Sequence, residues 1–547
     1  MASLSILPFE IQSMILDHCG FTTTRSYALV AKATTPAANR HLYREICLGP
    51  ASHVTQWTCE TVQYLLRTLT RRPDLAALVK NVHLDVDYTG NFVEEKRYLG
   101  KVSVGRAISD CTSLAKTVVE DLGFPNSRSW DIKLRHTSLD PWISLLLTQL
   151  TSMETLKLGP ALLHKSTFLG LMFEHLIKKR PNHFARLRSV SLGPADGGYK
   201  VAGLDYGREL YMPFFHLSSL EEFEVSLEHF PKLGERRVDQ TPSSLTTFRL
   251  LRSGGITPKQ LEDLMVLTPR LKTLHLGWNE EIKSGFVPFI PFASEIDFEA
   301  IKSVLGAVSP TLTTLTIGVT HYRPKTRQLA AEDDPTLPFL SWAASPLGSL
   351  ASFASLEHLE VPVNVLLDHI PWAIGLADVL PKSLKSLVLS DETLTWRQGV
   401  YEDLLMPWEH SLHTLVNLLV QYLVNHELCA PRLTSVVLDF TAAIGSDGSV
   451  PEALEDKLRR IAEASRITVE LHYVQAYPLE YWCRLYPVCL TIYNRQTPEV
   501  EPIIGCGGPL SRVPLYWCPR EWSRRQYAYR FPMQKALQKL GLYNQST

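Results

Sequence analysis

Residues that could perform catalysis or bind a metal are scattered along this chain of 547 residues, without the spacing that such chemistry needs. The nine cysteines include no Cys-x-x-Cys pair, so they indicate neither a zinc site nor a redox centre. The patterns His-Glu-x-x-His, Gly-x-x-x-x-Gly-Lys and Gly-x-Ser-x-Gly are also missing. The glycine-rich stretch Gly505–Pro509 lacks a strand before it and a helix after it, so we interpret it as a turn. We expect a protein that is not an enzyme, with no catalytic residue, cofactor or metal.

The composition gives no reason to expect a polyanion or a membrane as partner. Fifty-five basic and 56 acidic residues leave a net charge of -1, so any charged ligand would have to meet a local patch. A hydrophobic content of 45% with 20% charged residues is typical of a folded protein. No apolar run reaches the roughly 18 residues that a membrane span needs. We therefore expect an intracellular protein, cytoplasmic or nuclear.

The last part of the chain, residues 473–547, is rich in aromatic residues interleaved with arginine. Its arginines include Arg512, Arg520, Arg524, Arg525 and Arg530. Such a mixture could stack on single-stranded nucleic acid, although we do not expect that partner. The interpretation that we favour is a cap that folds over the end of the preceding structure. A third possibility is that the segment forms part of a binding site.

A phrase of six residues, apolar-x-x-apolar-x-apolar, occurs ten times between residues 79 and 438. The copies begin at Val79, Met153, Leu187, Leu220, Leu245, Leu271, Leu312, Leu356, Leu384 and Leu433. The final three residues alternate with period two, which predicts short strands with one buried face. The copy at Leu356 also matches the longer signature of leucine-rich repeats, including Asn364 at the ninth place. From Met153 onward, successive starts differ by 25 residues (Leu220 to Leu245) to 49 residues (Leu384 to Leu433), which is less regular than in such repeats.

Helical patterns lie between the phrases. Ile143, Leu146, Leu147 and Leu150 share one helical face, as do Leu415, Leu418, Leu419 and Tyr422. Asp140 before Pro141 predicts a helix cap, and Thr257 with Gln260 resembles a capping box. The alternation predicts an α/β fold in which residues 76–472 form an irregular leucine-rich-repeat solenoid, a horseshoe that binds through its concave strand face.

On that strand face, the residues on either side of the central apolar position are mostly Ser and Thr. The charged members gather in the middle of the array, and they are Glu222, Glu224, Arg249, His275, His358 and Glu360. We take these six as candidates for binding a target protein. The alternative is an ordinary solvated face of the strands.

Residues 4–48 predict three short helices ahead of the repeats. Pro8 suits a first helical position, and Ile11, Met14, Ile15 and Cys19 form one apolar stripe. A unit of this size buries little apolar surface by itself. The remainder is expected to be covered by a partner, or by the first repeat if the helices only cap the solenoid.

These residues resemble the F-box family. The resemblance rests on Leu7-Pro8-x-Glu10-Ile11, Ile15-Leu16, Ala28-Leu29-Val30-Ala31-Lys32 and Leu42-Tyr43-Arg44, in that order. Thr34 and Thr35 stand where the family usually has an aromatic residue. The whole architecture is similar to that of fungal F-box proteins with leucine-rich repeats.

The resemblance implies a substrate-recognition subunit of a Skp-cullin-F-box ubiquitin ligase. It implies adaptor contacts by Leu7, Pro8, Ile11, Ile15, Leu16, Leu29, Val30, Leu42 and Tyr43. The partners would be a Skp-type adaptor, a cullin through that adaptor, and an unidentified target protein. The alternative is a leucine-rich-repeat interaction scaffold that recruits no ligase. The expected order is an F-box-like domain (1–50), a linking helix (51–75), the solenoid (76–472) and the cap (473–547).

Overall fold

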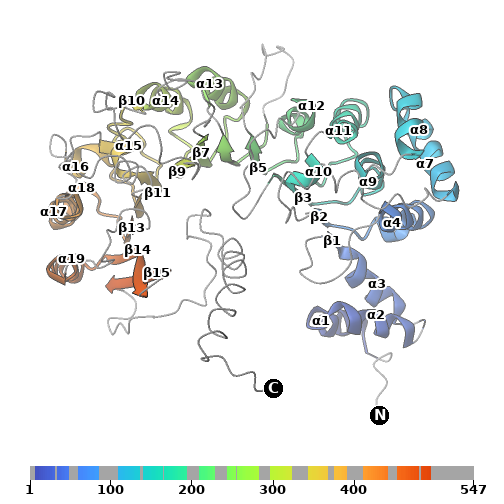
Figure 1. The fold of residues 1–547 in the computed structure, drawn as a ribbon, viewed down its shortest axis with the longest axis horizontal. Helices are drawn as coiled ribbons and strands as arrows, with labels where there is room; N and C mark the ends of the chain where they lie inside the picture. Colours follow the sequence, from blue (N-terminus) through green and yellow to red (C-terminus); the bar gives the residue numbers. More distant parts are fainter. Residues whose placement is uncertain are drawn as a thin grey trace, which may run out of the picture. The chain divides into compact units, whose positions relative to one another are not determined.

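The computed structural model of this chain describes residues 7–30, 32, 34–48, 59–84, 109–135, 139–163, 166–193, 208–227, 243–253, 256–281, 296–322, 343–367, 375–390, 411–440, 452–479 and 482–493. The protein is mixed α/β, with parallel strands and helices that alternate along the chain (Figure 1). It divides into two compact units, one of residues 1–193 and 203–275 and one of residues 194–202 and 276–547.

The first unit begins with three helices and continues as alternating strands and helices. Its helices are α1 (Phe9–Asp17), α2 (Phe21–Val30), α3 (Thr35–Arg44), α4 (Cys59–Arg71), α5 (Pro73–Ala76), α7 (Ser109–Leu122), α8 (Ser127–Arg135), α9 (Leu139–Leu147), α10 (Pro160–Leu163), α11 (Phe168–Lys179), α12 (Arg208–Tyr211), the 3-10 helix η2 (Met212–His216) and α13 (Pro258–Leu267). Its strands are β1 (Glu45–Leu48), β2 (Asn81–Leu84), β3 (Thr155–Leu158), β4 (Ser189–Leu192), β5 (Glu222–Leu227) and β6 (Thr247–Ser253). These strands pair in sequence order, each parallel to the next. Figure 1 shows α4, α9, α11 and α12 along one side of them.

The second unit repeats this alternation. Strand β7 (Thr273–Glu281) begins in the first unit and ends in the second. The further strands are β8 (Ile296–Asp297), β9 (Thr314–Tyr322), β10 (Ala343–Ser345), β11 (His358–Pro362), β12 (Ser386–Ser390), β13 (Ser435–Phe440), β14 (Thr468–Leu479) and β15 (Trp482–Tyr493). The helices are α14 (Phe298–Leu305), the 3-10 helix η3 (Gly306–Val308), α15 (Val363–Leu367), α16 (Leu376–Val379), α17 (Ser411–Val424), α18 (His426–Cys429) and α19 (Glu452–Ser465). Strands β9, β11, β12, β13 and β14 pair in that order and are parallel.

The strands predicted from the ten phrases are all present. Each begins two residues after the start of its phrase, as when Leu187 precedes β4. Neighbouring copies are in register, and Leu156, Val190, Phe223 and Phe248 follow one another across four strands, each at most 1% exposed. The fourth position of the phrase therefore forms a continuous row in the core of the first unit, which confirms the predicted buried face.

The second residue of each phrase joins neighbouring strands by its backbone. The carbonyl oxygen of Lys80 accepts hydrogen bonds from the amides of Glu154 (2.7 Å) and Thr155 (3.0 Å). The carbonyls of Glu154 and Arg188 accept the equivalent pairs one and two strands later. Because the same two bonds recur at each step from β2 to β7, they fix the register in which these strands meet.

In the four phrases that lead into β2, β3, β4 and β5, the side chains at this second position alternate in charge. Lys80 Nζ lies 2.6 Å from Glu154 Oε1, and Arg188 Nη1 lies 3.6 Å from Glu221 Oε1. The hydrogen bond from Lys80 lowers the pKa of Glu154. The four residues thus form a row of signs plus, minus, plus and minus along consecutive strands. We call this row the alternating charges.

The long interval between the first two phrases contains helices, and its described residues form no strand between β2 and β3. Strands β2 and β3 pair directly with each other. Within the interval, α7 and α8 pack against α9, which also contacts α4 and α11. Every residue from Pro141 to Leu147 is consequently buried, as expected for a helix that is covered on all sides.

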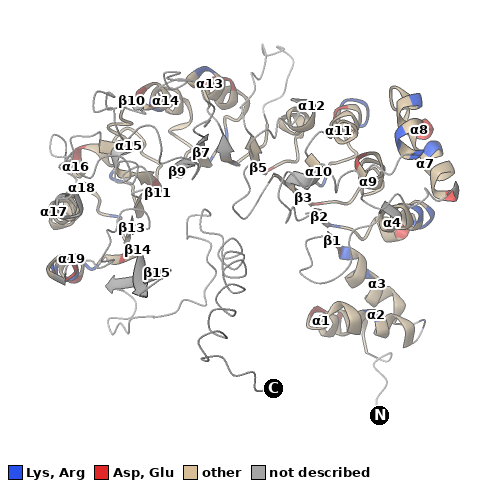
Figure 2. Cartoon of the chain, in the orientation of Figure 1, with Lys and Arg blue, Asp and Glu red and all other residues tan. Residues whose placement is uncertain are grey.

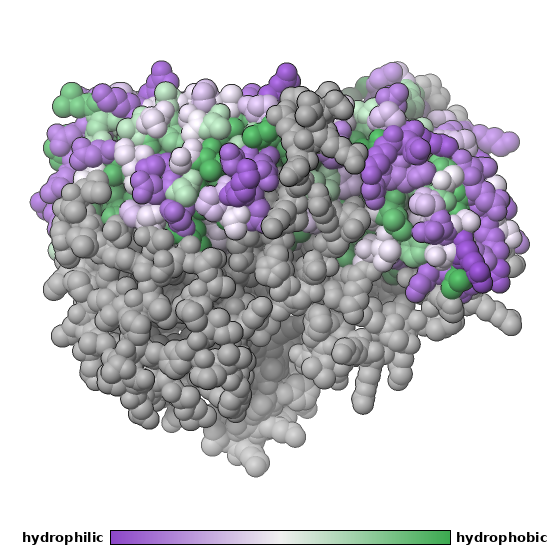
Figure 3. All heavy atoms as spheres, turned by 90° about the horizontal axis from the view of Figure 1, so that it is seen from above, coloured by the Kyte–Doolittle hydropathy of each residue, from purple (hydrophilic) through white to green (hydrophobic). Residues whose placement is uncertain are grey.

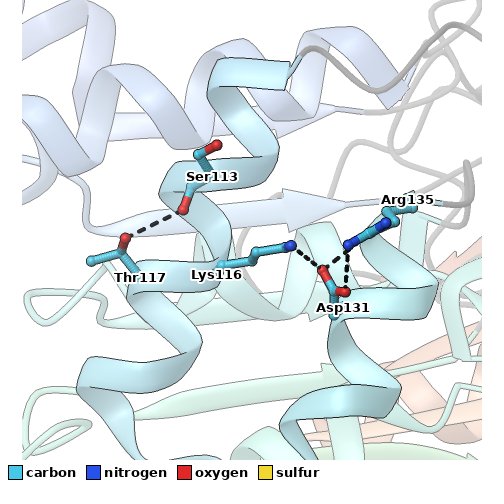
Figure 4. Close-up of polar contacts among 5 residues, drawn as sticks. All are labelled: Ser113, Lys116, Thr117, Asp131 and Arg135. Carbon is cyan, nitrogen blue, oxygen red and sulfur yellow. Dashed lines mark hydrogen bonds and ion pairs between the residues drawn. The ribbon is translucent and has the colours of Figure 1, made fainter.

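An aromatic cluster and an ion-pair network hold α7 and α8 in place. Trp130 of α8 packs on Phe124 and on Phe168 of α11, with ring centroids 4.9 and 4.5 Å apart. Figure 4 shows the polar contacts, in which Asp131 Oδ1 lies 2.6 Å from Lys116 Nζ and Asp131 Oδ2 lies 2.8 Å from Arg135 Nη2. Both cations lower the pKa of Asp131.

One of the two predicted helix starts is confirmed and the other is wrong. Thr257 and Gln260 form a reciprocal capping box at α13, with Thr257 N donating to Gln260 Oε1 at 2.8 Å. Helix α9, by contrast, begins at Leu139, so Asp140 already lies in its first turn. The Asp140 carboxylate instead accepts four hydrogen bonds at the start of α11. The residue pattern around Asp140 cannot predict a contact with a separate helix.

The start of the predicted C-terminal cap, residue 473, falls inside strand β14. This strand pairs antiparallel with β15, which ends the parallel series. The sequence that leads into β14, from Arg466 to Leu471, has the fourth and sixth apolar residues of the phrase but not the first. The arginine-rich remainder of the predicted cap lies outside the described residues.

Candidate interaction surfaces

The three N-terminal helices have a very small core. It consists of Leu16, Ala37 and Ala38, with Cys19, Tyr27 and Ala28 packed against it. Among the described residues of these three helices, no large aromatic side chain is fully buried. With so few contacts, most of the large apolar side chains of these helices cannot be covered within the unit.

A buried polar network adds to this core. Gln12 is 6% exposed, and its Nε2 donates to Leu7 O at 2.8 Å while its Oε1 accepts from Tyr27 Oη at 3.1 Å. Thr34 is 1% exposed and donates from Oγ1 to Tyr27 O at 2.9 Å. Thr35 donates in the same way to Ala28 O. Thr34 and Thr35 thus tie the start of α3 to α2, and their position is accounted for by hydrogen bonds.

Large apolar side chains are exposed on α1 and α2. Seven of the twelve exposed large apolar residues in the described part of the chain lie here, and they are Phe9, Ile11, Met14, Ile15, Phe21, Leu29 and Val30. Leu29 and Val30 are 80% and 74% exposed. On α1, Ile11, Met14 and Ile15 lie on one face because they are three and four residues apart. Figure 2 shows α2 with little charge.

The predicted adaptor residues do not all lie on this surface. Pro8, Ile11, Ile15, Leu29 and Val30 are exposed. Leu7, Leu42 and Tyr43 are half-buried. Leu16, by contrast, is 2% exposed and packs in the core with Ala37 and Ala38, so it lies outside this exposed surface.

The sequence did not single out Phe9 and Phe21, and it assigned Met14 to the apolar stripe without a role in contact. Their exposure depends on how the three helices pack, and the sequence pattern carries no signal for that. The half-buried Tyr43 has a second role, because it begins a copy of the phrase, Tyr43 to Leu48, that leads into β1.

The charged candidates on the strands of the first unit are largely engaged with one another. Ser191, Glu224 and Arg249 are partners in register on β4, β5 and β6. Ser191 Oγ donates to Glu224 Oε1 at 2.8 Å, and Arg249 Nη1 lies 3.9 Å from Glu224 Oε2. Burial, with Arg249 as a second cause, lowers the pKa of His275 to about 4, so His275 is neutral at pH 7. Glu222 is the exposed charge of this group.

The remaining two candidates belong to the second unit. His358 and Glu360 are both exposed on β11. Glu360 is in register with Thr316 of β9, whose Oγ1 lies 3.5 Å from Glu360 Oε2. The six candidates are therefore two groups, one on each unit, and each group is assessed as a separate surface.

Other kinds of site find no support in the described residues. No group of three His, Cys, Asp or Glu residues among them is arranged to hold a metal ion. In that same part of the chain, no helix is both long enough and apolar enough to cross a membrane. On the face shown in Figure 3, hydrophobic residues occur in small groups between hydrophilic ones.

Comparison with known proteins assigns no family. Neither the protein-family models nor the curated proteins include a match to this sequence.

Proposed function

We propose that this chain is the substrate-recognition subunit of a Skp-cullin-F-box ubiquitin ligase. In this proposal α1, α2 and α3 are the F-box, and the in-register strands with their helices are an irregular leucine-rich-repeat solenoid. The chain performs no catalysis itself. It raises the concentration of a target protein near the transfer enzyme.

The observation that carries the proposal is the exposed apolar surface of α1 and α2. Isolated apolar residues on a surface need no explanation. Seven of them on two short helices, however, form an exposed apolar surface of the kind that binds a partner. Each such side chain contributes roughly 1.5 to 3 kcal/mol when a partner covers it fully. Burial of Ile15, Leu29 and Val30 would together contribute roughly 5 to 9 kcal/mol, which is comparable with the roughly 4 to 15 kcal/mol that association costs, so an adaptor would have to cover the other exposed apolar residues of α1 and α2 as well.

A binding experiment with purified adaptor tests the proposal. The full chain, and variants Ile15→Glu and Leu29→Glu, are titrated with a Skp-type adaptor by calorimetry. We expect each variant to bind at least about tenfold more weakly, since a charge at a desolvated contact costs more than about 1.4 kcal/mol. Val266→Glu is the matched control, because Val266 is 43% exposed on α13 and should leave adaptor binding unchanged.

The second candidate function is a repeat scaffold that recruits no ligase. Thr34 favours it, because a buried hydrogen-bonded threonine stands where the F-box family usually has an aromatic residue. If the unmodified chain fails to bind the adaptor while circular dichroism shows it folded, the scaffold function replaces the first proposal.

A further inference from the structure

The second unit has a hollow between two neighbouring helices, α17 and α19. Its volume is about 470 Å³. Val420 lines it from α17, and the residues from α19 are Ala453, Asp456, Lys457, Arg460 and Ile461. Their spacing of three, four, seven and eight residues from Ala453 places them on one face of α19. The hollow is thus the groove between two helices that lie side by side.

An exposed apolar line continues from this hollow. Val424 lies one turn after Val420 on the same face of α17 and is 61% exposed, and Leu428, on the next helix α18, is 78% exposed. They are the most exposed large apolar residues described outside α1 and α2. The buried face of α17 is formed by other residues, among them Leu419 and Leu423. The core of the unit therefore does not account for the apolar character of this second face.

The rim of the groove has more positive than negative charge. Lys457 and Arg460 stand against a single carboxylate, that of Asp456. Lys457 Nζ donates to the neutral Asn417 Oδ1 at 2.5 Å, and neither cation forms an ion pair with a described residue. The adjacent Arg459, which does not line the hollow, is paired with Glu455 at 2.6 Å. Among the described residues, the positive charges of Lys457 and Arg460 thus have no ion-pair partner.

We propose that this groove binds a short amphipathic helix of a partner protein. The partner helix places apolar side chains four residues apart along Val420 and Val424, and a flanking carboxylate binds Arg460 and Lys457. Val420 and Val424 lie about one helical turn apart on α17, a rise of about 6 Å. This inference goes beyond the proposed ligase role and does not rest on it.

The test uses the full chain and two designed peptides of 16 residues, both labelled with fluorescein. The acidic peptide has leucines at positions 5, 9 and 12 with glutamates beside them, and the basic peptide has lysines in place of those glutamates. Fluorescence polarisation measures both affinities. We expect saturable binding of the acidic peptide, and binding of the basic peptide at least about tenfold weaker.

Three variants locate the binding. Val424→Glu should weaken the acidic peptide at least about tenfold, because it puts a carboxylate on the apolar line. Arg460→Glu should weaken the acidic peptide and strengthen the basic one. Val266→Glu, the same substitution at an exposed valine on α13, should alter neither affinity. Because all three positions are on the surface, the variants are expected to fold like the original chain.

Several results would overturn the inference. Equal affinity for both peptides, or binding that Val424→Glu leaves unchanged, would show that the groove does not select this helix. A monomer–dimer equilibrium seen by light scattering and abolished by Val424→Glu would assign the groove to a second copy of the chain. The result that supports the inference most directly is that Arg460→Glu binds the acidic peptide more weakly and the basic peptide more tightly than the original chain does.

Discussion

Asp140 caps a helix to which it does not belong, and removing its carboxylate should loosen that helix selectively. Oδ2 accepts from the amides of Thr167 and Phe168, both at 2.9 Å. Oδ1 accepts from Ser166 Oγ at 2.8 Å and from Leu169 N at 3.1 Å. Thr167, at the N-cap position of α11, makes no capping bond with its own side chain. Asp140 therefore supplies the missing cap from α9.

The size of the effect follows from two contributions. Loss of an N-cap costs typically about 1 kcal/mol and at most about 2. Loss of a negative charge at the positive end of a helix costs about 0.3 to 1 kcal/mol. We expect Asp140→Ala to destabilise the start of α11 by about 2 kcal/mol. Asp140→Asn keeps one acceptor oxygen and loses the charge, so we expect about 1 kcal/mol.

Hydrogen exchange of the full chain, followed by mass spectrometry, measures this locally. Peptides that cover residues 166–172 should exchange about 30-fold faster in Asp140→Ala, which is the rate equivalent of about 2 kcal/mol. Asp131→Ala is the control, since the Asp131 carboxylate has two partners in the same unit, Lys116 and Arg135, and neither lies in α11 (Figure 4). Unchanged exchange at the start of α11 in Asp140→Ala, or equal acceleration in Asp131→Ala, would refute the capping argument.

Three further predictions concern the first unit. Gly193 has φ +110°, and a Cβ there would lie 2.8 Å from Ser226 Cβ. We therefore expect Gly193→Ala to lower the free energy of unfolding by about 2 to 4 kcal/mol, measured by urea unfolding. The control Gly306→Ala, with open space around it, should be close to neutral. His275 has a pKa of about 4 in the fold against 6.5 when unfolded, so the unfolded chain binds the proton first and stability should fall as pH drops from about 6.5 to about 4. The loss is at most about 3 kcal/mol, and His275→Gln should abolish this part of the pH dependence. Leu156→Ala should cost about 2 to 5 kcal/mol by leaving a cavity in the row of buried residues, as urea unfolding will measure, and an effect below about 1 kcal/mol would contradict its place in the core.

The sequence predicts the strands well because their signal is local. Two apolar residues with period two, preceded by a third, identify each of the ten strands from its own six residues. Strand β14 was missed because Arg466 occupies the first place of its phrase, and β1 because Tyr43 to Leu48 was assigned to the end of the helical unit. In both cases the pairing with the neighbouring strand completes what the local pattern leaves ambiguous.

The candidate surfaces are less predictable because they depend on tertiary packing. Ile15 and Leu16 are adjacent and equally apolar, yet one is 38% and the other 2% exposed. The difference arises because Leu16 faces Ala37 and Ala38 of another helix. The capping role of Asp140 also depends on tertiary packing, since its hydrogen-bond partners are 26 to 29 residues away in the sequence. A helix periodicity gives the faces of a helix but not which face meets the rest of the protein.

The alternating charges affect which strands can pair with each other as the chain folds. Strands with nearly the same sequence and the same hydrogen-bonding pattern can pair with the wrong neighbour, which is a common failure of repetitive proteins. A pairing that omits one strand would set Lys80 beside Arg188, or Glu154 beside Glu221, in place of the ion pairs seen. Each exposed pair contributes less than about 1 kcal/mol to the final stability. Attraction becomes repulsion when one of these strands is omitted, so the four charges favour pairing in the observed order of β2, β3, β4 and β5.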